Sequence, residues 1–281
     1  MSTKDIRFGV NLSLTGGREA WQATARHAEE LGYDVLLAPD HLGRLTPLPA
    51  LVSVAAVTSR AKLGTFVLNT GFYRPALLAR DVAGLHELTD GRFELGLGAG
   101  YVAEEFEAAG LPFPSARQRV EQLEQTVSEV GMALSEAGHR VPVMIAGQGD
   151  RLLTVAARHA DIINISLSAS ATPEQPDPLA GRIELIRRVA GDRIADIELS
   201  LVLPTVHIGG VDDIDLSLLR RIHPGLSDEE ILCLSGVVHG TATDIANTLR
   251  RYRDTYDITY FVTMDIGENL TSLGRIIREF R

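Results

Sequence analysis

Two short segments place glycines at the end of apolar, strand-like runs, and glycine leaves backbone N–H groups open to a ligand. The first follows the run over residues 93–97, and the second closes the run over 141–146 just before a helical pattern over 151–159. The two segments comprise Gly98, Ala99, Gly100, Tyr101, Ala146, Gly147, Gln148 and Gly149. Because a helix N-terminus attracts anions, the second segment predicts a phosphate site.

The spacing of the first segment is G-x-G-x-G, not the G-x-G-x-x-G of a dinucleotide-binding fold, and it lies in mid-chain. This spacing argues against a dinucleotide fold and leaves the ligand open. A tight turn without a ligand stays as the alternative interpretation of these glycines. Two glycine-bearing strand ends on neighbouring strands favour a ligand more than either one alone.

A histidine and a polar strand end could contact a bound ring. Asp40 and His41 directly follow an apolar run over 34–38. A histidine held beside a carboxylate is suited to hydrogen-bond or protonate a ring, although a structural histidine in a loop is the alternative. The next apolar run ends in residues that could form a wall behind a planar group and contact its edge, namely Phe66, Val67, Leu68 and Asn69.

The elements that would position these residues alternate between strand and helix. Apolar strand patterns are separated by helical patterns, and no linker rich in proline, glycine or serine divides the chain. We expect strands over 7–12, 34–38, 62–69, 93–97, 141–146, 161–166, 197–203 and 258–264. Eight such units predict an α/β fold, a (β/α)₈ TIM barrel forming one domain over 1–281, with a doubly wound sheet as the rival.

Helices are expected over 18–31, 48–59, 75–90, 115–134, 151–159, 179–190, 244–253 and 270–280, with Thr241 as an N-cap. In a barrel of this kind the carboxyl ends of the strands form one face, where catalytic residues gather. Two long irregular stretches, 168–178 and 209–226, are expected there as lids, or alternatively as solvated crossovers.

The composition of the 281 residues excludes several classes of partner. A formal charge of −10 argues against nucleic acid and anionic membranes, and no apolar run approaches the length of a membrane span. Cys233 is the only cysteine, so no intrachain disulfide is possible, and we expect it to be buried. The histidines show no metal-ligand spacing, so no metal is expected. We expect a cytoplasmic protein.

The motifs together resemble a known family. These are the D-H pair at 40–41, L-G-T-F-V-L-N at 63–69, R-P-A-L-L-A-R at 74–80, L-T-D-G-R-F-E-L-G-L-G-A-G at 88–100 and I-A-G-Q-G at 145–149. They resemble the luciferase-like monooxygenase superfamily, and most closely its branch of oxidoreductases that use the deazaflavin coenzyme F-420. The resemblance implies a single barrel, commonly a homodimer, that binds a flavin or deazaflavin at the carboxyl face.

The resemblance also implies roles for individual residues. His41 is similar to the histidine that approaches the deazaflavin ring, with Asp40 in the same pocket. The bond between Phe66 and Val67 matches a non-prolyl cis peptide behind the ring, and Leu68 and Asn69 continue that wall. The cofactor tail would lie along Gly98, Ala99, Gly100 and Tyr101, and its phosphate at Gly147, Gln148 and Gly149.

The sequence departs from these relatives at two places. Tyr101 stands where the sugar-oxidising deazaflavin enzymes have a glutamate that serves as proton donor. The segment between Leu134 and Val141 is short, whereas many relatives have an extra strand and loop there. The resemblance therefore implies a more open site, or one that a partner chain completes.

We expect hydride transfer between coenzyme F-420 and a small organic substrate, with His41 as proton donor or polariser. An FMN-dependent monooxygenase of the same family is the first alternative. A barrel without a cofactor, acting as a lyase, a cyclase or a non-catalytic binding protein, is the second.

Overall fold

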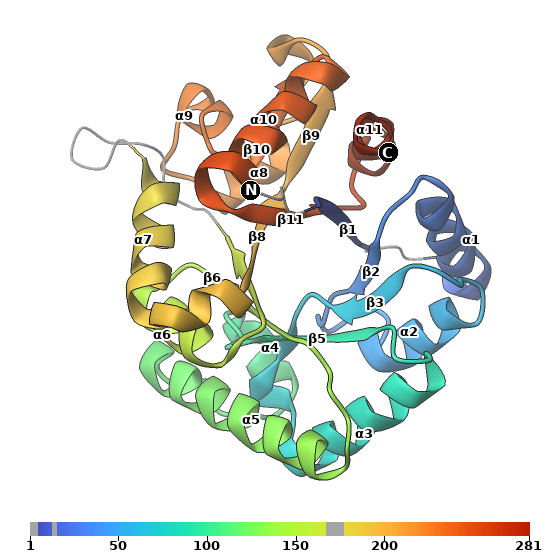
Figure 1. Cartoon of the computed structure of the whole chain (residues 1–281), viewed down its shortest axis with the longest axis vertical. Helices are drawn as coiled ribbons and strands as arrows, with labels where there is room; N and C mark the ends of the chain where they lie inside the picture. Colours follow the sequence, from blue (N-terminus) through green and yellow to red (C-terminus); the bar gives the residue numbers. More distant parts are fainter. Residues whose placement is uncertain (1–4, 13–15, 167–176) are drawn as a thin grey trace.

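The strands close into a parallel barrel, as the sequence predicts (Figure 1). The computed structural model describes residues 5–12, 16–166 and 177–281. Strands neighbour one another in the order β3-β2-β1-β11-β8-β7-β6-β5-β4, and a β3–β5 pairing closes the ring. The barrel strands are β1 (Arg7–Asn11), β2 (Val35–Ala38), β3 (Lys62–Thr65), β4 (Leu68–Asn69), β5 (Phe93–Gly98), β6 (Val143–Gly147), β7 (Ile162–Ile165), β8 (Glu198–Leu203) and β11 (Ile258–Met264).

The expected third strand, 62–69, is divided. β3 and β4 are its two halves, and Phe66 and Val67 lie between them, joined by a cis peptide bond. Counting β3 and β4 as one position gives the eight strands of a (β/α)₈ barrel. The predicted fold class is confirmed.

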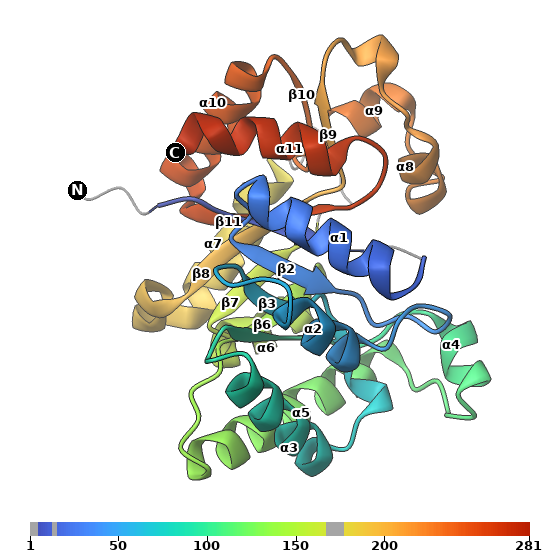
Figure 2. The same ribbon diagram turned by 90° about the vertical axis from the view of Figure 1, so that its right-hand side faces the viewer.

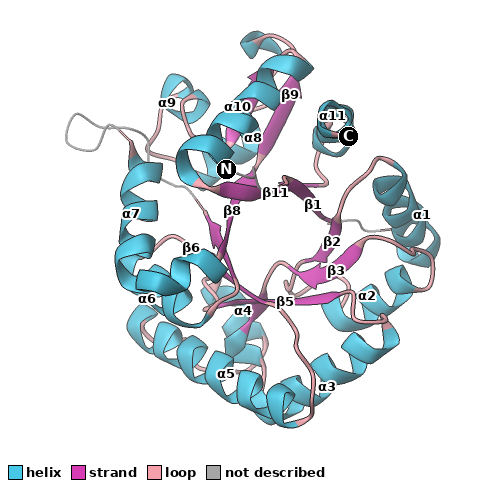
Figure 3. Cartoon of the chain, viewed as in Figure 1, coloured by secondary structure: helices cyan, strands magenta, loops and turns pink. Residues whose placement is uncertain are grey.

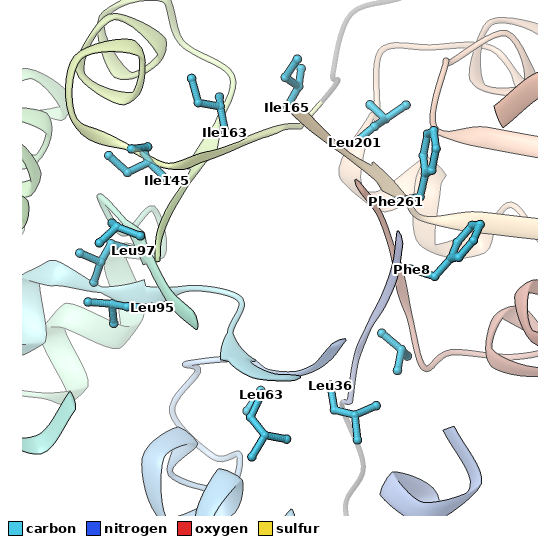
Figure 4. Packing of buried hydrophobic residues seen from close by; sticks show 14 of the residues in the cluster. Phe8, Leu36, Leu63, Leu95, Leu97, Ile145, Ile163, Ile165, Leu201 and Phe261 are labelled. Carbon is cyan, nitrogen blue, oxygen red and sulfur yellow. The ribbon is translucent and has the colours of Figure 1, made fainter. Parts of the chain in front are cut away.

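The core of the molecule lies between the barrel and its helices. Figure 4 shows side chains such as Phe8, Leu36 and Phe261 pointing away from the ring of strands into this layer. Because successive strand residues face opposite sides, the residues next to them fill the barrel. That interior cluster consists of Val35, Leu37, Met144, Ile162, Tyr260 and Val262.

The expected helices surround the barrel (Figures 1 and 3). They are α1 (Gly17–Glu30), α2 (Pro47–Ala55), α3 (Pro75–Leu88), α5 (Ala116–Glu136), α6 (Asp150–His159), α7 (Pro178–Ala190), α10 (Ala242–Tyr256) and α11 (Asn269–Ile277). Thr241 is the N-cap of α10, and it forms a capping box with Asp244. Of these helices, α5, α7 and α10 begin at a side-chain N-cap.

Several short elements were not expected. α4 (Ala103–Ala108) follows β5, and a small lobe between β8 and α10 contains β9 (Thr205–Ile208), α8 (Ser217–Ile222), α9 (Asp228–Leu232) and β10 (Val237–Gly240). Figure 2 shows α4, α8 and α9 on the same side of the barrel. The lobe has its own apolar cluster, which includes Leu219, Ile231 and Leu234.

Three expectations about loops and burial need comment. The stretch 209–226 is not wholly irregular, because it contains a 3₁₀ turn (Val211–Asp213) and α8. Of the other expected lid, 168–178, residues 168–176 lie outside the described residues. Cys233 is exposed, not buried, because it follows a five-residue helix whose neighbours Ile231 and Leu234 fill the lobe's core instead.

Charged side chains close the amino end of the barrel. Arg7 bridges Glu94, at 2.7 Å, and Glu198, at 2.6 Å, and its guanidinium lies 3.8 Å from the centre of the Tyr260 ring. Lys62 adds a second ion pair to Glu94, at 3.1 Å. A cavity of about 470 Å³ opens beside this cluster, lined by Arg7, Lys62 and Arg281 among others. The cations there pair with acidic groups of the chain, so this end stabilises the fold.

Candidate active site

His41 forms a hydrogen bond with an acidic residue that the sequence analysis did not single out. Its Nδ1 atom lies 2.9 Å from Oε1 of Glu105, which α4 carries. The His41 side chain is 39% exposed, whereas that of Glu105 is 16% exposed. The contact joins the loop after β2 to the segment after β5, at the carboxyl face of the barrel.

Asp40, the expected partner of His41, makes its hydrogen bonds elsewhere. Its Oδ2 atom accepts the N–H of Asn69 at 2.9 Å, and its carboxylate also accepts the Tyr73 hydroxyl. Burial raises the pKa of Asp40, against the opposing effect of these two hydrogen bonds. Adjacency in the sequence suggested Asp40 as the partner, but its side chain is directed to the end of β4. A direct role for Asp40 in the chemistry stays a prediction.

The wall expected behind a planar ring is formed where β4 packs on β5. A cis peptide joins Phe66 and Val67, where the resemblance implied one. A Cβ atom at Gly98 would lie 2.7 Å from Cγ2 of Val67, and one at Gly96 would lie 1.9 Å from the Thr65 carbonyl oxygen. These two glycines thus have a packing role of their own, because a larger residue at Gly98 would displace Val67 and one at Gly96 would collide with the backbone at Thr65.

Gly100 is fixed in the same way by Asn69. Its φ is +70°, and a Cβ atom there would lie 2.2 Å from Oδ1 of Asn69. That oxygen accepts the N–H of Gly71 at 3.0 Å. Arg119 of α5 donates to the Gly100 carbonyl at 2.9 Å. The loop from Gly98 to Gly100 is therefore held from both sides by contacts within the chain.

The second glycine segment lies on the strand next to the first. β5 and β6 are paired in parallel with Leu97 opposite Ile145, so the two strand ends are neighbours. Gly149 is the N-cap residue of α6, is exposed, and has open space where a Cβ would be. Asp150 starts the helix, and its carboxylate pairs with Arg182. The predicted adjacency is confirmed, and the phosphate site stays a prediction.

Tyr101 lies at the mouth of the site. Its side chain is 76% exposed, and its ring meets the His41 ring edge-on with centroids 6.1 Å apart. Leu42 and Leu45, in the loop after His41, are also exposed. Exposed apolar residues therefore follow the histidine in the chain, and the Tyr101 ring lies beside it.

Two buried asparagines at the carboxyl ends of barrel strands were missed by the sequence analysis. Asn11 of β1 and Asn164 of β7 are 3% and 1% exposed. In the described part of the chain, the Oδ1 atom of each has no hydrogen-bond partner. The Asn164 amide donates to Ser200 at 2.7 Å. Polar residues inside otherwise apolar strands were the available signal, since a buried amide without a partner is costly.

No metal centre or membrane span is found in what the structure describes. Over residues 5–12, 16–166 and 177–281, no group of three or more histidine, cysteine or acidic side chains could hold a metal ion. Over the same ranges, no helix is long and apolar enough to cross a membrane.

The parallel barrel, with its candidate site at the carboxyl ends of β2, β4, β5 and β6, defines a TIM-barrel protein. A profile of the luciferase-like monooxygenase family matches residues 7–213, and the chain belongs to this family. The family resemblance is confirmed.

Curated relatives are similar over part of the chain. An F420-dependent glucose-6-phosphate dehydrogenase of Nakamurella multipartita is 33% identical over 193 residues, 65% of this chain and 56% of that protein. A 5,10-methylenetetrahydromethanopterin reductase of Archaeoglobus fulgidus is 27% identical over 179 residues, 58% of this chain and 54% of that protein. The chain thus spans about half the length of the curated relatives it matches.

A solved structure supports the fold over nearly the whole chain. An F420-dependent secondary alcohol dehydrogenase, in complex with an F420-acetone adduct, superposes with a TM-score of 0.77 over 99% of this chain and all of that one. Its sequence identity is 16%, so it supports the fold alone.

Proposed function

We propose that this protein is an oxidoreductase that uses coenzyme F-420 to transfer hydride to or from a small organic substrate. One observation carries the proposal: a half-buried histidine, hydrogen-bonded to Glu105 at 2.9 Å, lies at the carboxyl face of a luciferase-like barrel. A neutral or charged imidazole at such a place can move the proton that accompanies a hydride. Similar curated relatives are named for their dependence on F420.

The residues present fit a deazaflavin. Its pyrimidine edge carries an N–H donor, and the buried Oδ1 atoms of Asn11 and Asn164 are acceptors without partners in the described chain. The segment from Phe66 to Asn69 would back the ring. The exposed turn at Gln148 and Gly149, at the start of α6, would hold the phosphate. When bound, the deazaflavin supplies a ring carbon that gives or takes a hydride.

The protein's own residues orient the substrate and move a proton. His41 would take the proton from a substrate hydroxyl, or give it to a substrate carbonyl in the reverse direction. The exposed side chains of Leu42, Leu45 and Tyr101 would border the substrate and exclude water from the reacting atoms.

A titration of the purified protein distinguishes this proposal from its alternatives. Coenzyme F-420 and FMN are added separately, and binding is followed by the change in cofactor absorbance and fluorescence. We expect saturable binding of coenzyme F-420 and its substrate-dependent reduction or oxidation. Tight FMN binding without F-420 binding would favour a monooxygenase. Binding of neither would favour a barrel without a cofactor.

A homodimer and a cytoplasmic location are further parts of the proposal. Val52 of α2 and Leu77 and Leu88 of α3 are exposed apolar side chains on the outer surface, and a second copy could cover them. Sedimentation equilibrium would show twice the 30.4 kDa mass of one chain, whereas a single-chain mass would contradict the homodimer.

A further inference from the structure

The contact between His41 and Glu105 fixes where the imidazole carries its proton. A carboxylate only accepts hydrogen bonds, so at 2.9 Å the Nδ1 atom of His41 must be the donor. In the neutral ring the other nitrogen, Nε2, is then the acceptor. Glu105 thus selects one of the two tautomers and leaves Nε2 able to take a proton.

Glu105 is held in place by the packing of α4. Phe106, the next residue, is buried and packs against the rings of Phe72 and Phe113, each with a centroid distance of 5.2 Å. Glu105 itself is only 16% exposed, whereas its neighbour Glu104 is exposed to solvent. A buried anchor therefore directs one of two adjacent acids toward the histidine.

Position 101 holds no carboxylate in this chain. Tyr101 stands there, 76% exposed, and meets His41 through its ring edge alone. The acid that reaches His41 comes instead from α4, four residues further along the chain.

We propose that Glu105 is a positioning residue that orients His41 for proton transfer and stabilises the ring once it is protonated. The proposal rests on the function proposed above. When a substrate alcohol is oxidised, its C–H bond breaks and the hydride goes to the cofactor. The hydroxyl proton goes to Nε2 of His41, and a carbonyl forms. In the reverse direction Nε2 returns the proton to the oxygen as the hydride reaches the carbon.

Two variants separate orientation from charge. Glu105→Gln keeps a hydrogen-bond acceptor but loses the charge, and Glu105→Ala loses both. Glu104→Gln is the matched control, because it removes a charge from the adjacent, solvent-exposed position. Circular dichroism and thermal unfolding check that each variant folds.

The first measurement is independent of the cofactor. Long-range ¹H–¹⁵N spectra of the imidazole report which ring nitrogen carries the proton. We expect the Nδ1–H tautomer of His41 in the wild type and in Glu104→Gln, and a mixture of tautomers in Glu105→Ala. An unchanged tautomer in Glu105→Ala would overturn the proposal, and this holds even if the protein proves not to bind coenzyme F-420.

The second measurement separates turnover from binding. Loss of a group that orients a catalytic histidine costs about 10- to 100-fold in rate, by analogy with residues that orient metal-bound histidines. We expect kcat to fall by that factor in Glu105→Ala and by less in Glu105→Gln, with the F-420 dissociation constant within about twofold of the wild type. Wild-type turnover in both variants would contradict the proposal. A wild type that binds no F-420 would instead refute the proposed function.

Discussion

Gly98 is a single residue whose lack of a side chain is needed for packing. Its missing Cβ leaves room for Val67, whose Cγ2 atom would otherwise lie 2.7 Å away. We expect Gly98→Ala to destabilise the protein by about 1–3 kcal/mol, as overpacking in a core does. Gly225→Ala is the control, because Gly225 is exposed, has no positive φ that would disfavour alanine, and would place the added Cβ in open space. Chemical denaturation measures both, and equal stability of the two variants would contradict this role for Gly98.

Glu29 is a second residue whose contribution to stability, and to its pH dependence, can be measured. Its Oε1 atom accepts the N–H groups of Ser59, Arg60 and Ala61, at 3.0, 2.7 and 2.8 Å, just before β3. Burial raises the pKa of Glu29, but these hydrogen bonds outweigh it and the pKa falls below 4.5. A folded-state pKa below the unfolded value gives stability that is present above pH 4.5 and is lost as the pH falls through the lower folded value.

We therefore expect Glu29→Gln to lower the free energy of unfolding by about 1 kcal/mol at neutral pH, because Glu29 is partly exposed. The difference between wild type and variant should shrink as the pH falls below 4.5. Denaturation curves at several pH values test this. If the stability difference between wild type and Glu29→Gln grew toward acid pH, the pKa of Glu29 would be raised by folding, not lowered, and the prediction would be wrong.

The preference of a helix for alanine over glycine can be tested in α3. Gly84 lies within α3, and nothing would lie within 4 Å of an added Cβ atom. Alanine is preferred to glycine inside a helix by about 0.5–1 kcal/mol, so Gly84→Ala should stabilise the protein by that amount. Thermal unfolding measures the change. Destabilisation would mean that this face of α3 is already covered, for instance by a second copy of the chain.

Element length explains which parts of the site could be predicted. The long helices and the apolar strands show their periods over enough residues, so the barrel and the adjacency of the β5 and β6 ends followed from the sequence. α4 has six residues and one buried position, Phe106, which is too little for a helical period to be seen. Glu105 was missed for that reason, and the short strands and helices of the lobe were missed likewise.

Contacts between residues far apart in the sequence explain why other features of the site could not be predicted. The sequence places Asp40 next to His41, but the fold directs Asp40 to Asn69 and Tyr73 and brings Glu105 to the histidine. The glycines of β5 were expected to leave backbone open, and the structure shows that Val67 and Asn69 occupy that space. These partners are far apart along the chain, so no local sequence pattern predicts their contacts.

The ion pairs at the amino end of the barrel contribute to the stability of the whole molecule. Arg7 joins β1 to β5 and β8 through Glu94 and Glu198, and Glu94 is only 3% exposed. Replacing Arg7 with methionine leaves Glu94 with only Lys62 as a partner, so we expect a loss of about 3 kcal/mol. Adding Glu94→Gln to Arg7→Met should recover part of that loss. A double variant no more stable than Arg7→Met alone would contradict this account.

The two ends of the barrel thus have separate tasks, since ion pairs hold one end and the candidate site lies at the other. Hydrogen–deuterium exchange with and without coenzyme F-420 tests this division most directly. We predict that the cofactor protects the amides of residues 66–71, 98–105 and 146–152, and leaves exchange around the cavity beside Arg7 unchanged. Protection confined to the amino end, or no protection at any of the three segments, would contradict the account.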